Sequence, residues 1–533
     1  MNIRRLNILP PTLLLAFSAL FSRVLGVMRD HLLAKIFGAT AGQGIFDLDV
    51  YYAAFRIPDM IYNLLVLGVV SSAFIPIFIQ YKKNSDTKNA WEFASSMLHL
   101  MFMAVAVVSG ILYIFAPYLA HVIAGGFSDE QIALTAKLIR ILLLSPIIFS
   151  VTSVVVSLQD SYKSFLLRSL GPLMYNTGII SGILLFSAKY GVIGVTWGVI
   201  IGALLQFIIQ LPALRMIGYK HIWILGTKRP DVRKAMKLMI PRILGLSMSQ
   251  ITLFVNTFIA SFLMTGSITV FYLSDNLQAV PLGMIGLAYA ITSFATLSEL
   301  ASEPTTKPFA DEIKKIIGRI LYLIIPATIG ILVLRSQIID TILVYGKFTQ
   351  ADALLTAKVL GFLVISLFSQ SLIPIIARGF YAFHNTKTPL ISGFTGEIIA
   401  ISGSLILALW LNLGIVGVAI AYSCGNIINF TILYILLQKK IKAEMLNWLS
   451  LFKMIVIGTI MGSVVHIMKL IVPFGGVAVT KIGILFVYVI TGAVVYFGLS
   501  AFLGMDEAEI VTKYFRKKKV QPVEVKDGEL ENM

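Results

Sequence analysis

The chain has 533 residues, of which 58% are hydrophobic and 13% are charged, against about 25% charged residues in ordinary soluble domains. With a mean hydropathy of +0.89, this composition excludes a soluble globular protein and indicates a polytopic membrane protein. The net charge of +17 would suggest a nucleic-acid partner in a soluble protein. Here the basic residues lie in loops between apolar segments, so we expect no nucleic-acid partner. The single cysteine, Cys424, excludes an intrachain disulfide.

Fourteen apolar segments are long enough to cross a bilayer, which requires about 20 residues per helix. The second segment is too long for one straight crossing, and its Pro58 and Gly68 predict a bent or interrupted helix. We therefore expect an all-α polytopic membrane protein with 14 transmembrane helices. These lie near residues 10–37, 45–80, 91–118, 132–157, 163–187, 191–213, 235–264, 267–298, 314–334, 353–377, 388–410, 413–437, 449–472 and 480–504.

The charges of the loops predict the orientation of the chain. Alternate loops are rich in Lys and Arg, whereas the loops between them carry little charge, and basic loops face the cytoplasm. Both termini are therefore expected to be cytoplasmic, and the polar tail is expected to be disordered. The basic stretches are 81–89, 160–168, 226–237, 307–319, 378–387, 438–444 and 513–519.

An internal repeat relates two parts of the chain. The segment "GGFSDEQIALTAKLIRILLLS" from Gly125 recurs as "GKFTQADALLTAKVLGFLVIS" from Gly346, an offset of 221 residues. The segment "GVIGV" from Gly191 likewise matches "GIVGV" from Gly414, an offset of 223 residues. Because the offset spans six helices, the two copies share one orientation, and their pseudo-axis runs along the membrane normal.

The repeat predicts how the chain is divided. We expect two six-helix repeats around a central cavity, followed by two C-terminal helices. The expected parts are an N-lobe of helices 1–6 (1–218), a basic cytoplasmic linker (219–234), a C-lobe of helices 7–12 (235–440), helices 13 and 14 (441–505) and a cytoplasmic tail (506–533).

Two similar bundles facing a cavity are typical of an alternating-access transporter. The sequence contains no HExxH, GxSxG or Walker A motif and no loop region large enough to assemble a catalytic domain, so we do not expect an enzyme. No metal site or required cofactor is predicted. The function expected from the residues alone is transport.

Charged residues concentrate in the first two helices, where an Arg at the bilayer centre costs roughly 2.5–3.5 kcal/mol and needs a partner or a hydrated cavity. Arg23 and Asp30, seven residues apart, lie near one stripe of the first helix, and Arg29 lies on another face. In the second helix Arg56 and Asp59 are neighbours, and Asp49 lies further towards its start. Structural pairing of Arg with Asp is one interpretation of these charges.

The other interpretation is a binding site for an anion. Several guanidinium groups around a cavity suit phosphate, because Arg offers a planar fork of donors that stays charged. A cation-coupled drug exporter would instead display acidic residues there. The residues thus favour a phosphorylated substrate.

Several motifs resemble one family of membrane proteins. They are "SRVLGVMRDHLLAKIFGA" (22–39), "DVYYAAFRIPDMI" (49–61), "SSAFIPIF" (71–78), "IPRILGLSMSQITLFVNTFIASFL" (240–263), "YGKFT" (345–349) and "GFYAFHNTKTP" (379–389). In register from about residue 8 to 505, the chain resembles the MurJ (MviN) lipid II flippase family of the multidrug, oligosaccharidyl-lipid and polysaccharide exporter superfamily.

The resemblance implies a function and a location. The expected function is movement of lipid II, the undecaprenyl-pyrophosphate-linked peptidoglycan precursor, from the inner to the outer leaflet of the bacterial cytoplasmic (inner) membrane. The expected partners are lipid II, membrane lipids and cell-wall synthesis proteins. The last two helices would hold the lipid tail. Proton, sodium and membrane potential are all compatible with these charges as the driving force.

The resemblance also implies the site residues. Arg23, Arg29 and Asp49 match important family positions, with Asp30 beside Arg29. Arg23 and Arg29 would bind the pyrophosphate, and Asp49 would orient them or take part in conformational coupling. Asp275 matches the aspartate that usually accompanies an arginine in helix 8 of the family, where it would orient the cations or take part in conformational coupling.

Two arginines of the family are missing. The one near the end of helix 2 falls on Tyr62, and the one in helix 8 falls on Asn276. Arg56 and Arg242 are the expected substitutes, although Arg242 follows Pro241 at a helix start and is equally compatible with an interfacial position. The alternatives are a flippase for another polyprenyl-linked saccharide, an ion-coupled exporter of the same superfamily, or a membrane scaffold of a cell-wall assembly complex.

Overall fold

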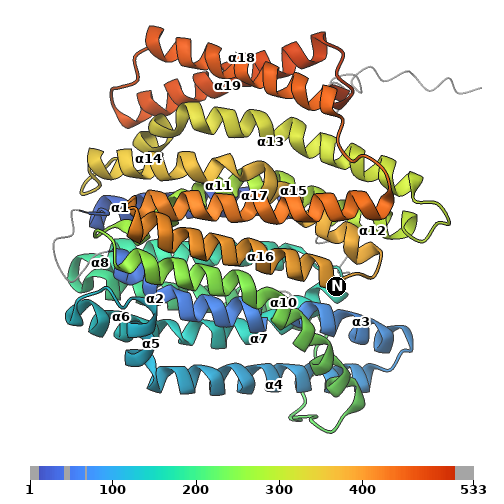
Figure 1. Cartoon of the computed structure of the whole chain (residues 1–533). Helices are drawn as coiled ribbons and strands as arrows, with labels where there is room; N and C mark the ends of the chain where they lie inside the picture. The colour runs from blue at the N-terminus through green and yellow to red at the C-terminus, as the bar shows by residue number, and fades with distance from the viewer. Residues whose placement is uncertain (1–10, 41–47, 67–68, 510–533) are drawn as a thin grey trace, which may run out of the picture. The chain divides into compact units, whose positions relative to one another are not determined.

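The computed structural model describes residues 11–40, 48–66 and 69–509, and in this part of the chain all regular structure is helical (Figure 1). The elements are α1 (Pro11–Phe37), α2 (Leu48–Ile61), η2 (Tyr62–Val66), α3 (Val69–Lys83), α4 (Thr87–Ile114), α5 (Ala116–Ile123), α6 (Asp129–Leu142), α7 (Leu144–Ser161), α8 (Leu166–Ile208), α9 (Leu211–Ile217), α10 (Pro230–Ser261), α11 (Ser267–Pro281), η3 (Leu282–Leu287), α12 (Ala288–Leu300), α13 (Lys307–Ile342), α14 (Gln350–Ile365), α15 (Leu367–Ala382), α16 (Lys387–Ser404), η4 (Leu405–Trp410), α17 (Gly414–Ile441), α18 (Trp448–Ile471), α19 (Ala478–Phe502) and η5 (Asp506–Ala508).

Helices cover each of the fourteen expected segments. By length and composition, ten helical segments of the described residues can cross a membrane, which confirms an all-α, multi-pass membrane protein. One of the ten, Leu166–Ile217, contains two of the expected crossings. The expected crossings at 10–37, 45–80 and 235–264 are not among the ten. The number of fourteen crossings stays a prediction.

The expected interruption of the second segment is present. Helix α2 contains Pro58 and ends at Ile61, and the π-helical segment η2 follows it before α3 begins at Val69. Gly68 lies outside the described residues. A second π-helical segment, η3, interrupts the eighth expected crossing between α11 and α12. The two π segments begin 220 residues apart, close to the offset of the sequence repeat.

Local backbone features recur at the same offset. Ser128 caps α6 and Thr349 caps α14, each through a reciprocal capping box, and the two residues are 221 positions apart. Lys163 and His384, also 221 apart, both have a positive φ. Gly191 and Gly414 both have φ 57° at the turn before the last helix of a repeat. The repeat found in the sequence is therefore a repeat of local structure.

Glycines bring the two halves of α8 close together where they fold back at Gly191. Gly198 faces Gly182, and a Cβ added at Gly198 would lie 2.7 Å from the Cα of Gly182. The second repeat has the same arrangement between α16 and α17, where a Cβ added at Gly396 would lie 2.7 Å from the carbonyl oxygen of Gly425. Small residues allow such close helix pairs in membranes.

Gly198→Ala is expected to lower the free energy of unfolding by about 1–3 kcal/mol, because the methyl group would force the backbones of the α8 hairpin apart. Thermal unfolding of the purified protein measures the effect. Gly110→Ala in α4 is the matched control, since a Cβ there meets open space. Equal stability of the two variants would contradict the close contact.

The chain forms two compact units. Unit 1 comprises Met1–Val280, Arg335–Ser366 and Thr386–Ile432. In it α1 lies against α8, α2 against α6, α4 against α7, and α10 against α3 and α16 (Figure 1).

Unit 2 comprises Pro281–Leu334, Leu367–Asn385 and Leu433–Met533. In it α18 pairs with α19 and α12 with α15. Helix α13 contacts both C-terminal helices. Tyr322 Oη lies 2.6 Å from Ser500 Oγ of α19, and Lys469 Nζ of α18 donates to the Val333 carbonyl at 2.9 Å.

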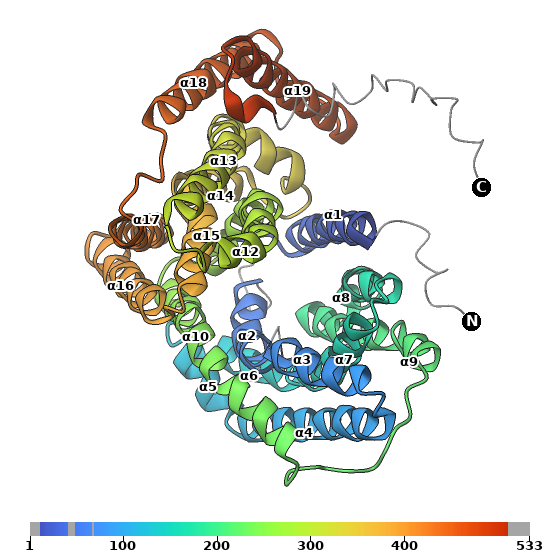
Figure 2. The ribbon, with the colours of Figure 1, turned by 90° about the vertical axis from the view of Figure 1, so that its right-hand side faces the viewer.

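The linker between the repeats is bound to α4 (Figure 2). The Ile222 N–H donates to Ser95 Oγ at 3.1 Å, and His99 Nδ1 lies 2.8 Å from the Ile224 carbonyl. Arg229 pairs with Glu92 and, at 2.9 Å, with Asp231. Burial alone would raise the pKa of Asp231, but hydrogen bonds from Arg229 and Tyr81 outweigh it and hold that pKa below its usual range. The linker is thus a fixed part of unit 1.

Candidate functional site

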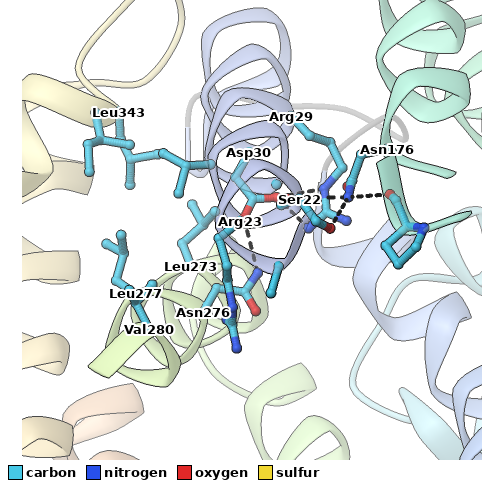
Figure 3. Close-up of a pocket in the computed structure, with 15 residues that line it drawn as sticks. Ser22, Arg23, Arg29, Asp30, Asn176, Leu273, Asn276, Leu277, Val280 and Leu343 are labelled. Carbon is cyan, nitrogen blue, oxygen red and sulfur yellow. Dashed lines mark hydrogen bonds and ion pairs between the residues drawn. The ribbon is translucent and has the colours of Figure 1, made fainter. Parts of the chain in front are cut away.

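A cavity of about 350 Å³ in unit 1 gathers four of the predicted site residues (Figure 3). Its wall is formed by one side of α1, by the start of α8, by α11 and by the end of α13. Arg23, Arg29 and Asp30 come from α1, and Asn276 comes from α11. The remaining wall is largely apolar, which strengthens electrostatic interactions inside the cavity.

Asp30 is the centre of a polar chain in this cavity (Figure 3). Arg29 donates to Asp30 Oδ1 from Nε at 2.9 Å and from Nη2 at 2.8 Å. Asn276 Nδ2 donates to the other oxygen, Oδ2, at 3.0 Å. Asp30 is 7% exposed, so these bonds compensate for burying its charge. The site thus brings together Arg29 and Asn276, which belong to different repeats.

Arg23 is placed differently. Its side chain is exposed in the cavity, and it forms no ion pair or hydrogen bond with the described residues. The sequence predicted that Arg23 and Asp30 share a stripe of the helix, yet Asp30 pairs with Arg29. The reason is reach, because the Arg29 side chain folds along the helix to its neighbour. Arg23 is therefore a cation available to a ligand.

The cavity also holds polar residues that the sequence analysis did not identify. Asn176 of α8 donates from Nδ2 to Ser22 Oγ at 3.2 Å and to the Pro172 carbonyl at 3.1 Å. This pair joins α8 to α1 directly beside the two arginines (Figure 3). The sequence feature that could have identified Asn176 is a polar Asn within an apolar segment.

Asp49 lies outside the cavity lining and has another role. It is 3% exposed, and its Oδ2 accepts from the Gly266 N–H at 2.8 Å. Its Oδ1 accepts from the Thr269 N–H at 2.7 Å and from Thr269 Oγ1 at 2.6 Å. Asp49 of α2 therefore binds the N-terminus of α11, where a negative charge is favourable. This contact joins the two repeats.

The same end of unit 1 has a second contact of this kind. Asp352, in the first turn of α14, accepts hydrogen bonds from the Thr40 N–H at 3.1 Å and from Thr40 Oγ1. The Lys347 N–H donates to the Lys35 carbonyl at 2.9 Å, and His31 Nδ1 lies 2.6 Å from the Ile342 carbonyl. The end of α1 is thus bound to the segment between α13 and α14.

The other predicted residues lie away from the cavity lining. Arg56 Nε donates to Thr257 Oγ1 at 2.8 Å, and the predicted neighbour Asp59 forms no ion pair or hydrogen bond with the described residues. Asp275 accepts from Gln278 Nε2 at 2.8 Å. The side chain of Arg242 lies outside the described residues. The structure therefore does not bring Arg56 into the cavity as a substitute for the missing arginines.

In the described ranges no group of three or more His, Cys, Asp or Glu residues could hold a metal ion. The chemistry that the cavity offers is binding of an anion, through the free Arg23 and the partly exposed Arg29.

Asn276→Ala is expected to lower the free energy of unfolding by about 1.5–3 kcal/mol, because the buried Asp30 carboxylate would lose one of its hydrogen-bond donors. Thermal unfolding of the purified protein measures this, with Asn84→Ala in an exposed turn as the control. A stability equal to that of the unchanged protein would show that the contact with Asp30 contributes nothing.

Long apolar helices in two repeats, with a cation-containing cavity, define this protein as a multi-pass membrane transporter. Residues 33–487 match the family model described as "Lipid II flippase MurJ". The chain belongs to this family. Membership confirms the predicted family and the prediction of a transporter rather than an enzyme.

Individual relatives support the same family. A probable lipid II flippase MurJ of Vibrio cholerae is 31% identical over 443 residues, covering 80% of this chain and 82% of that protein. The Thermotoga maritima protein of the same name is 28% identical over 502 residues, covering 94% of this chain and 98% of that protein.

Solved structures show the same fold. A structure described as "Lipid II flippase MurJ, inward closed conformation" matches with a TM-score of 0.76 at 25% identity, covering 95% of this chain and all of that one. An inward-facing multidrug transporter of the MATE family and MOP superfamily matches with a TM-score of 0.67 at 15% identity, covering 79% of this chain and 94% of that one. The second match concerns the fold alone.

Proposed function

We propose that this protein moves lipid II from the inner to the outer leaflet of the bacterial cytoplasmic membrane by alternating access. The observation that carries the proposal is the cavity in which Arg23 and Arg29 lie together, with Arg23 free of protein partners among the described residues. Two guanidinium groups suit the two phosphoryl groups of a pyrophosphate. Family relatives are named lipid II flippases, which supports this substrate.

The contacts of Asp49 and Asp352 support a role for the repeats in access. Both carboxylates join elements of the first repeat to elements of the second, and both lie in segments that flank the cavity helices α1 and α11. Moving these elements apart would break the hydrogen bonds of Asp49 and Asp352. The closed arrangement therefore has stabilising contacts of its own, which a transition between two distinct states requires.

The orientation in the membrane is part of the proposal. We place both termini in the cytoplasm because the basic loops alternate with uncharged ones. Protein partners in cell-wall synthesis and the coupling ion stay predictions, with proton, sodium and membrane potential as alternatives.

The test is complementation of a bacterial strain depleted of its own lipid II flippase. The protein should restore growth and should restore the appearance of lipid II in the outer leaflet, measured by its accessibility to an external enzyme or probe. Growth without restored lipid II accessibility would contradict the proposal.

A second function is favoured by one observation. The resemblance implies an arginine at the positions of Tyr62 and Asn276. In this protein the Tyr62 ring centroid lies 5.0 Å from that of Phe149, and Asn276 presents an amide to Asp30. A cavity with fewer cations fits a different polyprenyl-linked saccharide. Failure to export lipid II, together with export of another lipid-linked glycan, would favour this alternative.

A further inference from the structure

Unit 2 contains a separate cavity of about 360 Å³. It lies where three membrane helices begin or end: beside the first turns of α13, at the N-terminus of α18, and at η5, which follows the end of α19. None of the residues predicted for the transport site lines it.

Basic and acidic side chains both line this cavity. Lys314, Lys315 and Arg319 of α13 line it, and Lys315 and Arg319, four residues apart, lie on one face of the helix. Asp506 and Glu507 of η5 also line the cavity, and Asp311 and Glu509 add two further carboxylates. Within the described part of the chain the three cations form no ion pair with these acids. The cavity therefore offers separate cationic and anionic positions to a ligand.

The start of α18 also lines the cavity. Asn447 caps this helix by accepting from the Ser450 N–H at 3.3 Å, and both residues line the cavity. The N-terminus of a long helix carries a partial positive charge, which favours a phosphate group nearby. The helix end and the three basic side chains thus belong to the lining of one cavity.

The cavity lies at the boundary between polar and apolar surface. The charged residues at the start of α13 end at Arg319, and an uncharged, largely apolar stretch follows from residue 320 to 334. In the first turns of α18, Trp448, Leu449 and Phe452 are 62%, 65% and 64% exposed. An exposed Trp is typical of the membrane interface, and the exposed apolar residues beyond it face lipid. A ligand in the cavity would therefore have an apolar surface available for acyl chains.

We propose that this cavity binds the headgroup of an amine-bearing phospholipid, phosphatidylethanolamine in chemical class. Lys314, Lys315 and Arg319 would bind its phosphate, and Asp506 and Glu507 would accept hydrogen bonds from its ammonium group. A purely anionic headgroup would meet the carboxylates without a cation to neutralise them. A choline headgroup has no N–H donor for them.

The test measures binding of single lipids to the purified full chain by native mass spectrometry. Phosphatidylethanolamine should bind about tenfold more tightly than phosphatidylcholine and than phosphatidylglycerol of the same acyl chains, because each of those lacks one set of charge-assisted hydrogen bonds. Inorganic phosphate should not displace the lipid. Equal binding of the three lipids, or tighter binding of phosphatidylglycerol, would overturn the proposal.

Separate variants test the basic residues and the acidic residues of the cavity. Arg319→Gln should weaken phosphatidylethanolamine binding about tenfold, and Lys315→Gln, at an exposed position, replaces it if the first variant does not fold. The double variant Asp506→Asn and Glu507→Gln should lose the preference over phosphatidylglycerol. Glu303→Gln with Lys307→Gln, outside the cavity at the same end of α13, should change nothing. Unchanged selectivity in the acid variant would contradict the role of the carboxylates. Because the readout is lipid binding, it does not depend on lipid II export.

Discussion

Arg23→Ala is expected to abolish lipid II export and the rescue of a depleted strain, with no loss of thermal stability. Arg23 is exposed in the cavity and has no protein partner among the described residues, so removing it breaks no described contact. A hydrogen bond to a charged group contributes about 1.5–3 kcal/mol, which corresponds to roughly 10- to 100-fold weaker pyrophosphate binding. Growth rescue and outer-leaflet accessibility of lipid II measure the loss.

Two comparisons make this prediction specific. Arg215→Ala removes an exposed arginine of α9 outside the cavity lining and should support normal export. Arg29→Ala should reduce export and also lower the free energy of unfolding by about 3 kcal/mol, because it leaves the buried Asp30 carboxylate without its cation. Normal export by the Arg23→Ala variant would exclude Arg23 as a pyrophosphate ligand.

Asp49→Ala should give the second large effect. The substitution leaves two backbone N–H groups and the Thr269 hydroxyl without their acceptor. At about 1–3 kcal/mol for each of these three unpaired buried groups, we expect the contact between α2 and α11 to lose at least about 3 kcal/mol of stabilising free energy. The two elements should separate more often, and transport should fail because this contact no longer holds one closed state.

Thiol labelling measures that separation. In a Cys424→Ser background, Ala39→Cys places a thiol at a residue that is 1% exposed and whose carbonyl lies against Gly266. The introduced thiol should react slowly in the protein that keeps Asp49 and fast in the Asp49→Ala variant. The Asp49→Asn variant should react at an intermediate rate, because one side-chain oxygen remains as an acceptor. Asp129→Ala, an exposed acid in the first turn of α6, is the control. Equal labelling in all variants would contradict the role of Asp49 in closure.

The sequence predicted the repeat and the helical fold because both depend on local patterns. Capping residues such as Ser128 and Thr349 and the glycine turns at Gly191 and Gly414 act within a few residues of themselves, so the offset visible in the sequence reappears in the backbone. Hydropathy does not register a π-helical segment, because an extra residue in a turn leaves the segment equally apolar. The π-helical interruption at η3 was therefore not predicted.

The site was predicted in part. Arg23, Arg29, Asp30 and Asn276 do lie around one cavity, since three of them share α1. The partner of Asp30 was not predictable from spacing, because a flexible arginine reaches its neighbour more easily than a residue two turns away. The bond from Asn276 joins residues 246 positions apart, and no periodicity within one helix indicates such a contact.

The charges lining the cavity have an electrical consequence. Arg23 and Arg29 against Asp30 leave one net positive charge, whereas a pyrophosphate carries about two negative charges, one on each phosphoryl group. The loaded cavity is therefore negative overall. Across a membrane that is negative inside, carrying one such charge outward releases about 2.3 kcal/mol per 100 mV. We therefore expect the membrane potential to contribute to outward transport, and export measured at imposed membrane potentials tests this expectation.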